Sequence, residues 1–379
     1  MLIKTSVHLK VRFEMGFNCG ILGLPNVGKS TLFNALTSTQ IAESKNYPFC
    51  TIEPNVGKVE IKDKRLDLIS EISKSEKKIY NQLEFVDIAG LVKGASKGEG
   101  LGNKFLSNLS EVDAIIHLVR CFNDKNITHV DDEISPLNDI SVIETELLLS
   151  DLSKAENIYE NFKKKNKGKK TDENIIILYE KVVKNLNDGK LLRNCSFSNS
   201  EIKILKEFNL LTIKPQIYVC NVDENSIIEG NDLSKQVEAF AKTKNIKVLN
   251  ISAGIESEIS QIESIQEKNE FLSSIGLKET SLSKLIKDGY DLLNLISFFT
   301  SGPKESKSWS CQTGTLAPDA GAKIHTDFKK GFIKAEVISY SDFVEYKGEQ
   351  NCKDIGKMRF EGKDYIVSDA DIITFKFNV

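Results

Sequence analysis

The stretch that most constrains the fold runs from Gly23 to Thr31 and reads Gly-Leu-Pro-Asn-Val-Gly-Lys-Ser-Thr. It fits the pattern G-x4-G-K-[ST], and it lies between an apolar run at 17–22 and a helix-like run at 32–36. Strand, glycine turn and helix in this order form the context in which the pattern binds phosphate. Glycines let backbone N–H groups surround a polyphosphate, and the helix N-terminus adds partial positive charge. The stretch therefore predicts a nucleotide site.

Residue types within this loop assign individual roles. The Lys29 ammonium is expected to reach the β- and γ-phosphates as a catalytic group, and the Ser30 hydroxyl is expected to bind Mg2+. The residues expected to contact the nucleotide here are Asn26, Val27, Gly28, Lys29, Ser30 and Thr31.

Two later segments supply the other expected Mg2+ ligands. Thr51 lies in a proline-containing loop and is the candidate switch threonine, the alternative being an ordinary loop threonine. Asp87 ends an apolar run and begins Asp-x-x-Gly, so its carboxylate is expected to hold Mg2+ through water. The N–H of Gly90 is expected to touch the γ-phosphate. Ser30, Thr51 and Asp87 thus form the predicted metal site.

Leu91 occupies the position at which Ras-like proteins place a water-orienting glutamine. A leucine side chain forms no hydrogen bond, so hydrolysis should be slow or aided by another group. His117, in the apolar run 114–120, is the catalytic candidate for that role. A histidine packed beneath a helix is the alternative, and both interpretations stay open. The glycine-rich stretch 93–102 is expected to act as a switch.

The base-recognition motif departs from that of GTPases. Asn221-Val222-Asp223-Glu224 follows the apolar run 216–220, where GTPases carry Asn-Lys-x-Asp. Glu224 replaces the aspartate and is one methylene too long for its bidentate pairing with guanine, so a strict guanine site is not expected. Ser252 belongs to a later Ser-Ala pair that should close over the base. The expected base-site residues are Asn221, Val222, Glu224 and Ser252.

Composition bounds the class of protein. A chain of 379 residues with 40% hydrophobic content can form two or three domains. The formal charge of −3 excludes an overall basic protein, so any nucleic-acid contact needs a local patch, and no DNA partner is expected. Seven cysteines without metal-ligand spacing indicate reduced thiols and a cytoplasmic location. No apolar run approaches membrane-spanning length, and no membrane partner is expected.

The pattern of periodicities divides the chain into segments. Helical periodicity from residue 140 to 187, interrupted by the lysine-rich run 163–170, predicts an inserted antiparallel helical hairpin. The acidic run 124–139, which contains Pro136, is expected to be a connecting loop. The expected segments are an N-terminal extension (1–14), a nucleotide-binding domain in two parts (15–140 and 206–297), the helical insertion (141–205) and a C-terminal domain (298–379).

The C-terminal domain is expected to be a small α+β module. Residues 292–299 should end a helix, and Ser301-Gly302-Pro303 should break it. The expected elements after this break are strands at 308–311, 333–338, 365–367 and 372–377, with a helical piece at 320–329.

These motifs together resemble the YchF / Obg-like ATPase family over nearly all of Met15–Val379. The resemblance is carried by Gly23–Thr31, Asn46–Pro54, Asp87–Gly102, Arg120-Cys121-Phe122 and Asn221–Glu224, and for a TGS domain by residues 324–328, 346–350 and 362–367. It implies an α/β P-loop NTPase (G-domain-like) sheet with an inserted antiparallel helical hairpin and a C-terminal α+β ubiquitin-like (TGS) domain. It also implies a preference for ATP over GTP and association with ribosomes. Leu91 matches the family, whereas Gly254 departs from the lysine expected after Ser-Ala. Asn26 resembles the P-loop asparagine of NTPases that K+ accelerates.

Two hypotheses of function follow. The first is a ribosome-associated, Mg2+-dependent, Obg-related ATPase that acts as a switch, with a slow intrinsic rate. The alternative is a nucleotide-gated ribosome- or RNA-binding protein in which hydrolysis is incidental. A GTPase is disfavoured by Val222 and Glu224.

Overall fold

The computed structural model describes residues 17–44, 56–88, 101–124, 127, 133–167 and 173–378. These residues form two compact units. The larger unit takes its residues from 18–62 and 83–295. The smaller unit combines 63–82 with 296–378, so it draws on two distant stretches of the chain.

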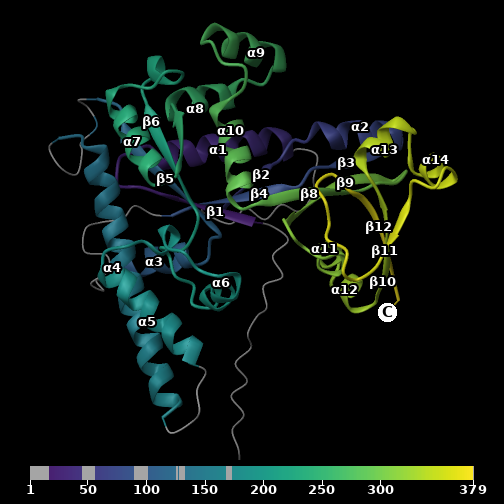
Figure 1. Cartoon of the computed structure of the whole chain (residues 1–379). Helices are drawn as coiled ribbons and strands as arrows, with labels where there is room; N and C mark the ends of the chain where they lie inside the picture. The colour runs from purple at the N-terminus through teal and green to yellow at the C-terminus, as the bar shows by residue number, and fades with distance from the viewer. Residues whose placement is uncertain are drawn as a thin grey trace, which may run out of the picture. The chain divides into compact units, whose positions relative to one another are not determined.

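A six-stranded sheet organises the larger unit (Figure 1). Its strand order is β2-β4-β1-β5-β6-β7, and β1, β5, β6 and β7 run parallel. Parallel strands place their carboxyl ends at one edge of a sheet, and ligands bind outside that edge. The strands are β1 Phe17–Leu22, β2 Val56–Glu60, β4 Gln82–Asp87, β5 Ala114–Cys121, β6 Gln216–Val222 and β7 Lys247–Ile251.

Burial explains why these runs form strands. Every residue of β5 and of β6 is buried, as expected for parallel strands covered on both faces. A core cluster joins Val119 and Tyr218 of these strands to Val237 and Ile255 of two helices. The helices of this unit outside the insertion are α1 Lys29–Ser44, α3 Leu101–Ser110, α7 Asp232–Thr243, α8 Ala253–Gln261, α9 Ile265–Ser274 and α10 Ser281–Leu292.

The predicted helical hairpin is present between β5 and β6. Helices α4 (Pro136–Lys165) and α5 (Glu173–Asn187) pack side by side (Figure 1), and η2 (Leu192–Asn194) and α6 (Asn199–Lys206) follow. The insertion has its own apolar core, made of Ala155, Leu178, Val182, Leu186, Leu192, Leu205 and Leu210. No helix among the described residues is both long and apolar enough to cross a membrane.

The prediction that Pro136 lies in a connecting loop was wrong, because Pro136 begins α4. Proline suits the first position of a helix, where its missing N–H would have no intrahelical partner.

The smaller unit is built on a second six-stranded sheet, of order β11-β10-β12-β8-β9-β3. One face packs against α11 and α12 through a cluster that includes Phe298, Ala320 and Phe375. The other face carries a cluster with Leu66 and Phe343. The elements are β3 Lys77–Ile79, β8 Leu295–Thr300, β9 Glu305–Gln312, β10 Phe332–Ile338, β11 Arg359–Glu361, β12 Ile372–Phe377, α2 Lys64–Ile72, α11 Ala317–Ile324, α12 Thr326–Lys330, α13 Tyr340–Glu345 and α14 Glu349–Asp354.

Three predictions for this part of the chain were wrong. Residues 295–300 form β8 rather than the end of a helix, because Phe298 and Phe299 pack into opposite faces of the sheet. The expected strand at 365–367 is reduced to one isolated bridge between Leu316 and Ile366. The single helical piece at 320–329 is two helices, since His325 has an extended backbone between them.

The segment 63–82 is an integral part of the smaller unit. Its strand β3 pairs in parallel with β9, and its helix α2 contributes the fully buried Leu66 and Ile69 to the core. Since β2 precedes this segment and β4 follows it, the chain leaves the first sheet, completes the second, and returns at the strand that ends in Asp87.

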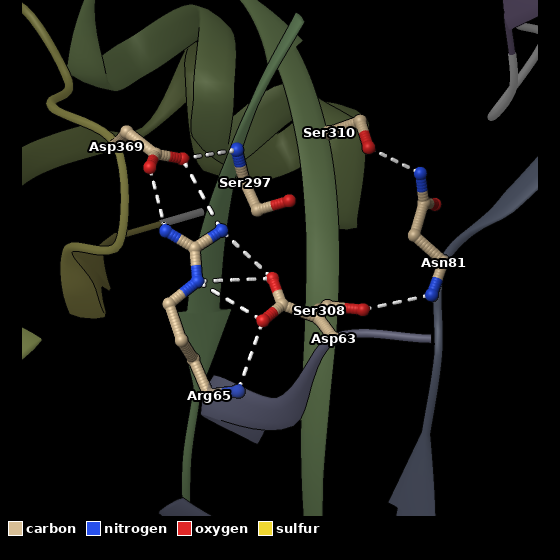
Figure 2. A network of polar contacts seen from close by, with 7 residues as sticks. All are labelled: Asp63, Arg65, Asn81, Ser297, Ser308, Ser310 and Asp369. Carbon is tan, nitrogen blue, oxygen red and sulfur yellow. Dashed lines mark hydrogen bonds and ion pairs between the residues drawn. The ribbon is translucent and has the colours of Figure 1, made fainter. Parts of the chain in front are cut away.

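Polar contacts fix the start of this segment to the smaller unit (Figure 2). The Arg65 guanidinium donates to Asp63 at 2.7–3.1 Å and to Asp369 at 2.6 Å. The Asp369 carboxylate also accepts the Ser297 N–H at 3.0 Å. Hydrogen bonding to Asp63 raises the pKa of Arg65, so the guanidinium remains charged. Through Asp369 it links the start of α2 to Ser297 of β8.

The end of the segment is held by hydroxyl groups of β9. The Asn81 N–H donates to Ser308 Oγ at 2.7 Å, and the Asn81 side-chain amide donates to Ser310 Oγ (Figure 2). Both contacts lie within the smaller unit, so the segment is fixed on both sides of α2 and β3.

Replacing Leu66 tests the contribution of this segment. Leu66→Ala should destabilise the smaller unit by about 2–5 kcal/mol, because the leucine is fully buried beside Phe299 and Phe343. Trp309, the one tryptophan of the chain, packs against the core of this unit, so its fluorescence during urea unfolding reports the change. Lys64→Ala, on the exposed face of the same helix, is the matched control and should change stability by less than about 0.5 kcal/mol. An unchanged midpoint for Leu66→Ala would contradict the assignment.

Candidate nucleotide-binding site

The loop between β1 and α1 has the geometry of a phosphate-binding turn. Asn26 and Gly28 have φ values of 62° and 97°, in the left-handed region. A Cβ atom on Gly28 would lie 2.4 Å from Asn221 Nδ2, and one on Gly23 would lie 2.6 Å from the Leu118 carbonyl oxygen. Both glycines are therefore required by close approach of neighbouring groups.

Lys29 begins α1, and its ammonium folds back over the loop. It donates to the carbonyl oxygens of Gly23 at 2.9 Å and Leu24 at 2.7 Å. Burial lowers the pKa of Lys29 to about 8, although the Asp87 carboxylate opposes this change. The first turn of α1 contains no acidic residue, so nothing on the helix offsets its positive end.

Asp87 ends β4, and its carboxylate is half-buried. Its Oδ1 atom is inaccessible to solvent and has no hydrogen-bond partner among the described residues. Burial raises the pKa of Asp87, and the Lys29 ammonium opposes that rise. A buried carboxylate oxygen that still needs a partner is a suitable ligand for a hard cation.

The donor set of this site fits Mg2+. The Asp87 carboxylate and the exposed hydroxyl-bearing residue Ser30 both offer oxygen, the ligand type that Mg2+ prefers. Magnesium at phosphate sites takes its remaining ligands from phosphates and water. A cluster of three or more acidic, histidine or cysteine residues is therefore unnecessary, and the described residues contain none.

Asn221 connects the phosphate loop to the loop after β7. Its Nδ2 donates to the Val27 carbonyl at 2.9 Å, and its Oδ1 accepts the Ala253 N–H at 3.0 Å. Asn221 and Ser252 are both nearly inaccessible, with 5% and 4% exposed surface. The structure thus brings Val27, Gly28, Asn221 and Ser252 together at the carboxyl edge of the sheet.

The other two expected base-site residues lie in different surroundings. Val222 is the last residue of β6, and its side chain packs into the core with Cys121 and Tyr218. Glu224 is exposed at the start of the short helix η3 (Glu224–Ser226), and its carboxylate forms no hydrogen bond or ion pair with a side chain in the described part of the chain. Of these two side chains, Glu224 is therefore the one that is free to meet a base.

His117 is enclosed between the sheet and the insertion. It is 1% exposed, and its ring lies 5.4 Å from that of Tyr218 on the neighbouring strand. Its Nδ1 has no hydrogen-bond partner among the residues that the structure describes. Burial lowers the pKa of His117 to about 4, with Glu144 opposing, so the imidazole is neutral near pH 7. This environment is that of a packed histidine.

Thr51, Gly90 and Leu91 lie outside the described residues, as does most of the glycine-rich stretch 93–102.

Asn231 is not among the expected site residues, although it lies beside the base motif. Its Nδ2 donates to the Cys121 carbonyl at 2.7 Å and to Asp223 Oδ2 at 3.1 Å. A sequence signal existed, because Asn231 followed three residues later by Ser234 is a helix N-cap pattern before an amphipathic run.

Comparison with known proteins places this chain in a family. A family model described as "50S ribosome-binding GTPase" matches residues 18–150. A second model, named YchF-GTPase_C and described as a protein of unknown function, matches residues 295–378. The "Ribosome-binding ATPase YchF" of Pasteurella multocida is 50% identical over 366 residues, which cover 96% of this chain and all of the relative.

The chain belongs to the YchF family. The YchF protein of Bacillus subtilis is 45% identical over 370 residues, again covering 96% of this chain and all of the relative. The solved structure of the YchF GTPase from Schizosaccharomyces pombe matches with a TM-score of 0.85 and 36% identity, over 95% of this chain and 98% of that one. The YchF fold, with its P-loop NTPase sheet, helical insertion and C-terminal module, confirms the predicted fold class.

The burial of His117 predicts a pH dependence of stability. The folded pKa near 4 lies below the ordinary value of 6.5, so between these pH values the unfolded chain binds more protons. The contribution of His117 to stability is therefore fully present above pH 6.5, and about 3 kcal/mol of it is lost as pH drops towards 4. In His117→Asn, urea unfolding followed by circular dichroism should show a correspondingly smaller fall. His325→Asn, which removes an exposed imidazole, should keep the wild-type fall. An undiminished fall in His117→Asn would contradict this assignment.

Proposed function

We propose that this YchF-family chain is a Mg2+-dependent ATPase that prefers ATP to GTP and acts on the ribosome in the cytoplasm. The observation that carries the proposal is a glycine-built phosphate loop with a buried Lys29 ammonium, which lies within electrostatic reach of the Asp87 carboxylate and its unpartnered Oδ1 among the described residues. The names of the Pasteurella multocida and Bacillus subtilis relatives, both ribosome-binding ATPases, support it.

The chemistry we assign is in-line attack of water on the γ-phosphate. Lys29 exchanges its contacts with the Gly23 and Leu24 carbonyls for phosphate oxygens, and the loop N–H groups bind the remaining charge. Ser30, Thr51 and Asp87 would hold Mg2+, which neutralises charge that develops on the phosphates. In this proposal the Gly90 N–H also contacts the γ-phosphate.

The preference for adenine rests on the base motif. The description of the family model names a GTPase, whereas the relatives are named ATPases. The preferred base of this chain is therefore inferred from its own residues. Asn221 is occupied in bridging two loops, and the buried Val222 offers the base no lysine stem. Glu224 is too long for the bidentate pairing that an aspartate makes with guanine, which removes the main source of guanine selectivity.

A slow intrinsic rate accompanies this assignment. Leu91 offers no hydrogen bond to water, and His117 is buried and neutral. We therefore propose that His117 affects hydrolysis by supporting β5, the neighbour of the phosphate-loop strand, rather than by contacting water. Asn26, which reaches the left-handed φ of this loop, is the residue we propose for K+ stimulation.

The burial of His117 also favours the alternative function, nucleotide-gated binding to ribosomes or RNA with incidental hydrolysis. Titration of ribosomes into purified protein with ATP distinguishes the two. A rise in turnover of tenfold or more supports the ATPase switch. ATP-dependent binding without that rise supports the alternative, and binding that ignores the nucleotide contradicts both.

Removing the Lys29 ammonium tests the phosphate site. Lys29→Ala should weaken binding of a non-hydrolysable ATP analogue at least tenfold and reduce turnover about 100-fold, because a desolvated charge contact to phosphate is lost. Wild-type affinity should also fall as pH rises above about 8, since free Lys29 then loses its proton. Calorimetry and phosphate release measure both effects, and Lys242→Ala on the exposed face of α7 is the control. Wild-type affinity in Lys29→Ala would refute the assignment.

A further inference from the structure

The loop that follows the base motif is closed by one asparagine. Asn231 is the N-cap of α7, and its Oδ1 accepts the N–H groups of Leu233 at 3.1 Å and Ser234 at 3.0 Å. Its Nδ2 donates to the Cys121 carbonyl at the end of β5 and to the Asp223 carboxylate. Asn231 thus joins three elements that meet at the carboxyl edge of the sheet.

Asp223 is held on a second side by Ser226. The Ser226 hydroxyl donates to Asp223 Oδ1 at 2.8 Å, while Asn231 donates to Oδ2 at 3.1 Å. Each carboxylate oxygen therefore has a donor from its own loop. Although partial burial opposes the change, these two hydrogen bonds lower the pKa of Asp223, so the carboxylate stays ionised in this arrangement.

The two adjacent acidic side chains differ in their hydrogen bonding. Asp223 is bound within its loop, whereas Glu224 makes no side-chain hydrogen bond or ion pair within the described ranges. An aspartate that could reach the base would offer the short carboxylate that pairs with the N1–H and N2–H donors of guanine, and adenine has neither donor.

We propose that Asn231 and Ser226 are specificity-determining positioning residues, which hold the Asp223 carboxylate away from the base and so disfavour guanine. The inference rests on the proposed preference for ATP. Neither residue is assigned a contact with the nucleotide. Both act through Asp223. Asn231 is suited to this role because its amide oxygen caps α7 while its amide nitrogen donates to the Cys121 carbonyl and to the Asp223 carboxylate.

Asn231→Ser separates the two uses of this amide. Serine keeps a good N-cap oxygen for α7 but has no Nδ2 to donate to Asp223 or to the Cys121 carbonyl. The matched control is Asn231→Ser combined with Asp223→Asn, which loosens the loop in the same way but removes the carboxylate. Thermal melts of both variants show whether α7 remains folded.

The measurement is calorimetric binding of non-hydrolysable ATP and GTP analogues, with turnover at saturating ATP. In Asn231→Ser the ratio of GTP to ATP dissociation constants should fall about fivefold, the scale of one lost hydrogen bond, and kcat should stay within about twofold of wild type. In the double variant the ratio should return to within about twofold of the wild-type value.

Three results would overturn the inference: an unchanged ratio in Asn231→Ser, equal weakening of both nucleotides, or a lowered ratio that Asp223→Asn fails to restore. The proposed function is tested separately by the wild-type chain in the same experiment. Wild-type protein that binds GTP as tightly as ATP would refute the proposed preference. If the wild type prefers ATP but the ratio of dissociation constants is unchanged in the variants, only the role of Asn231 is refuted.

Discussion

The Asn221 side chain lies between the Val27 carbonyl and the Ala253 N–H, and both of its polar ends are hydrogen-bonded while only 5% of the residue is exposed. Nδ2 also lies 2.4 Å from the position that a Cβ atom on Gly28 would take, so the close approach of the asparagine requires the glycine. Through this amide the phosphate loop after β1 and the loop after β7 are fixed at a common edge. The close approach is possible because both loops leave parallel strands of one sheet.

The smaller unit depends on the same stretch of chain that supplies Asp87. Residues 63–82 add a strand and a buried helix to the second sheet, and Arg65 and Asn81 fix them there (Figure 2). The C-terminal residues alone would lack this strand and one of the helices that cover the sheet. The smaller unit therefore includes the segment that connects β2 to β4 of the first sheet, and β4 begins at the end of this segment.

Local patterns predicted the first sheet and the phosphate loop, because glycine spacing, short apolar runs and one motif act over a few residues. For His117 the local pattern left both the packed and the catalytic role open. It could not decide between them, because the neighbouring Tyr218 and Glu144 come from distant parts of the chain. The run 292–299 was wrongly predicted to end a helix, because a short apolar stretch fits a buried helix and a buried strand equally well. The contribution of residues 63–82 to the second sheet was missed because β3 pairs with a strand more than 200 residues later, a contact without local signal.

Base preference is the claim on which the proposed function depends most directly. The decisive measurement is equilibrium binding of non-hydrolysable ATP and GTP analogues to the wild-type chain with Mg2+, by calorimetry. We expect ATP to bind at least tenfold more tightly than GTP, since Val222 is buried and Glu224 replaces the guanine-pairing aspartate. Tighter binding of GTP would contradict it and would place this chain among the guanine-specific members of the P-loop class.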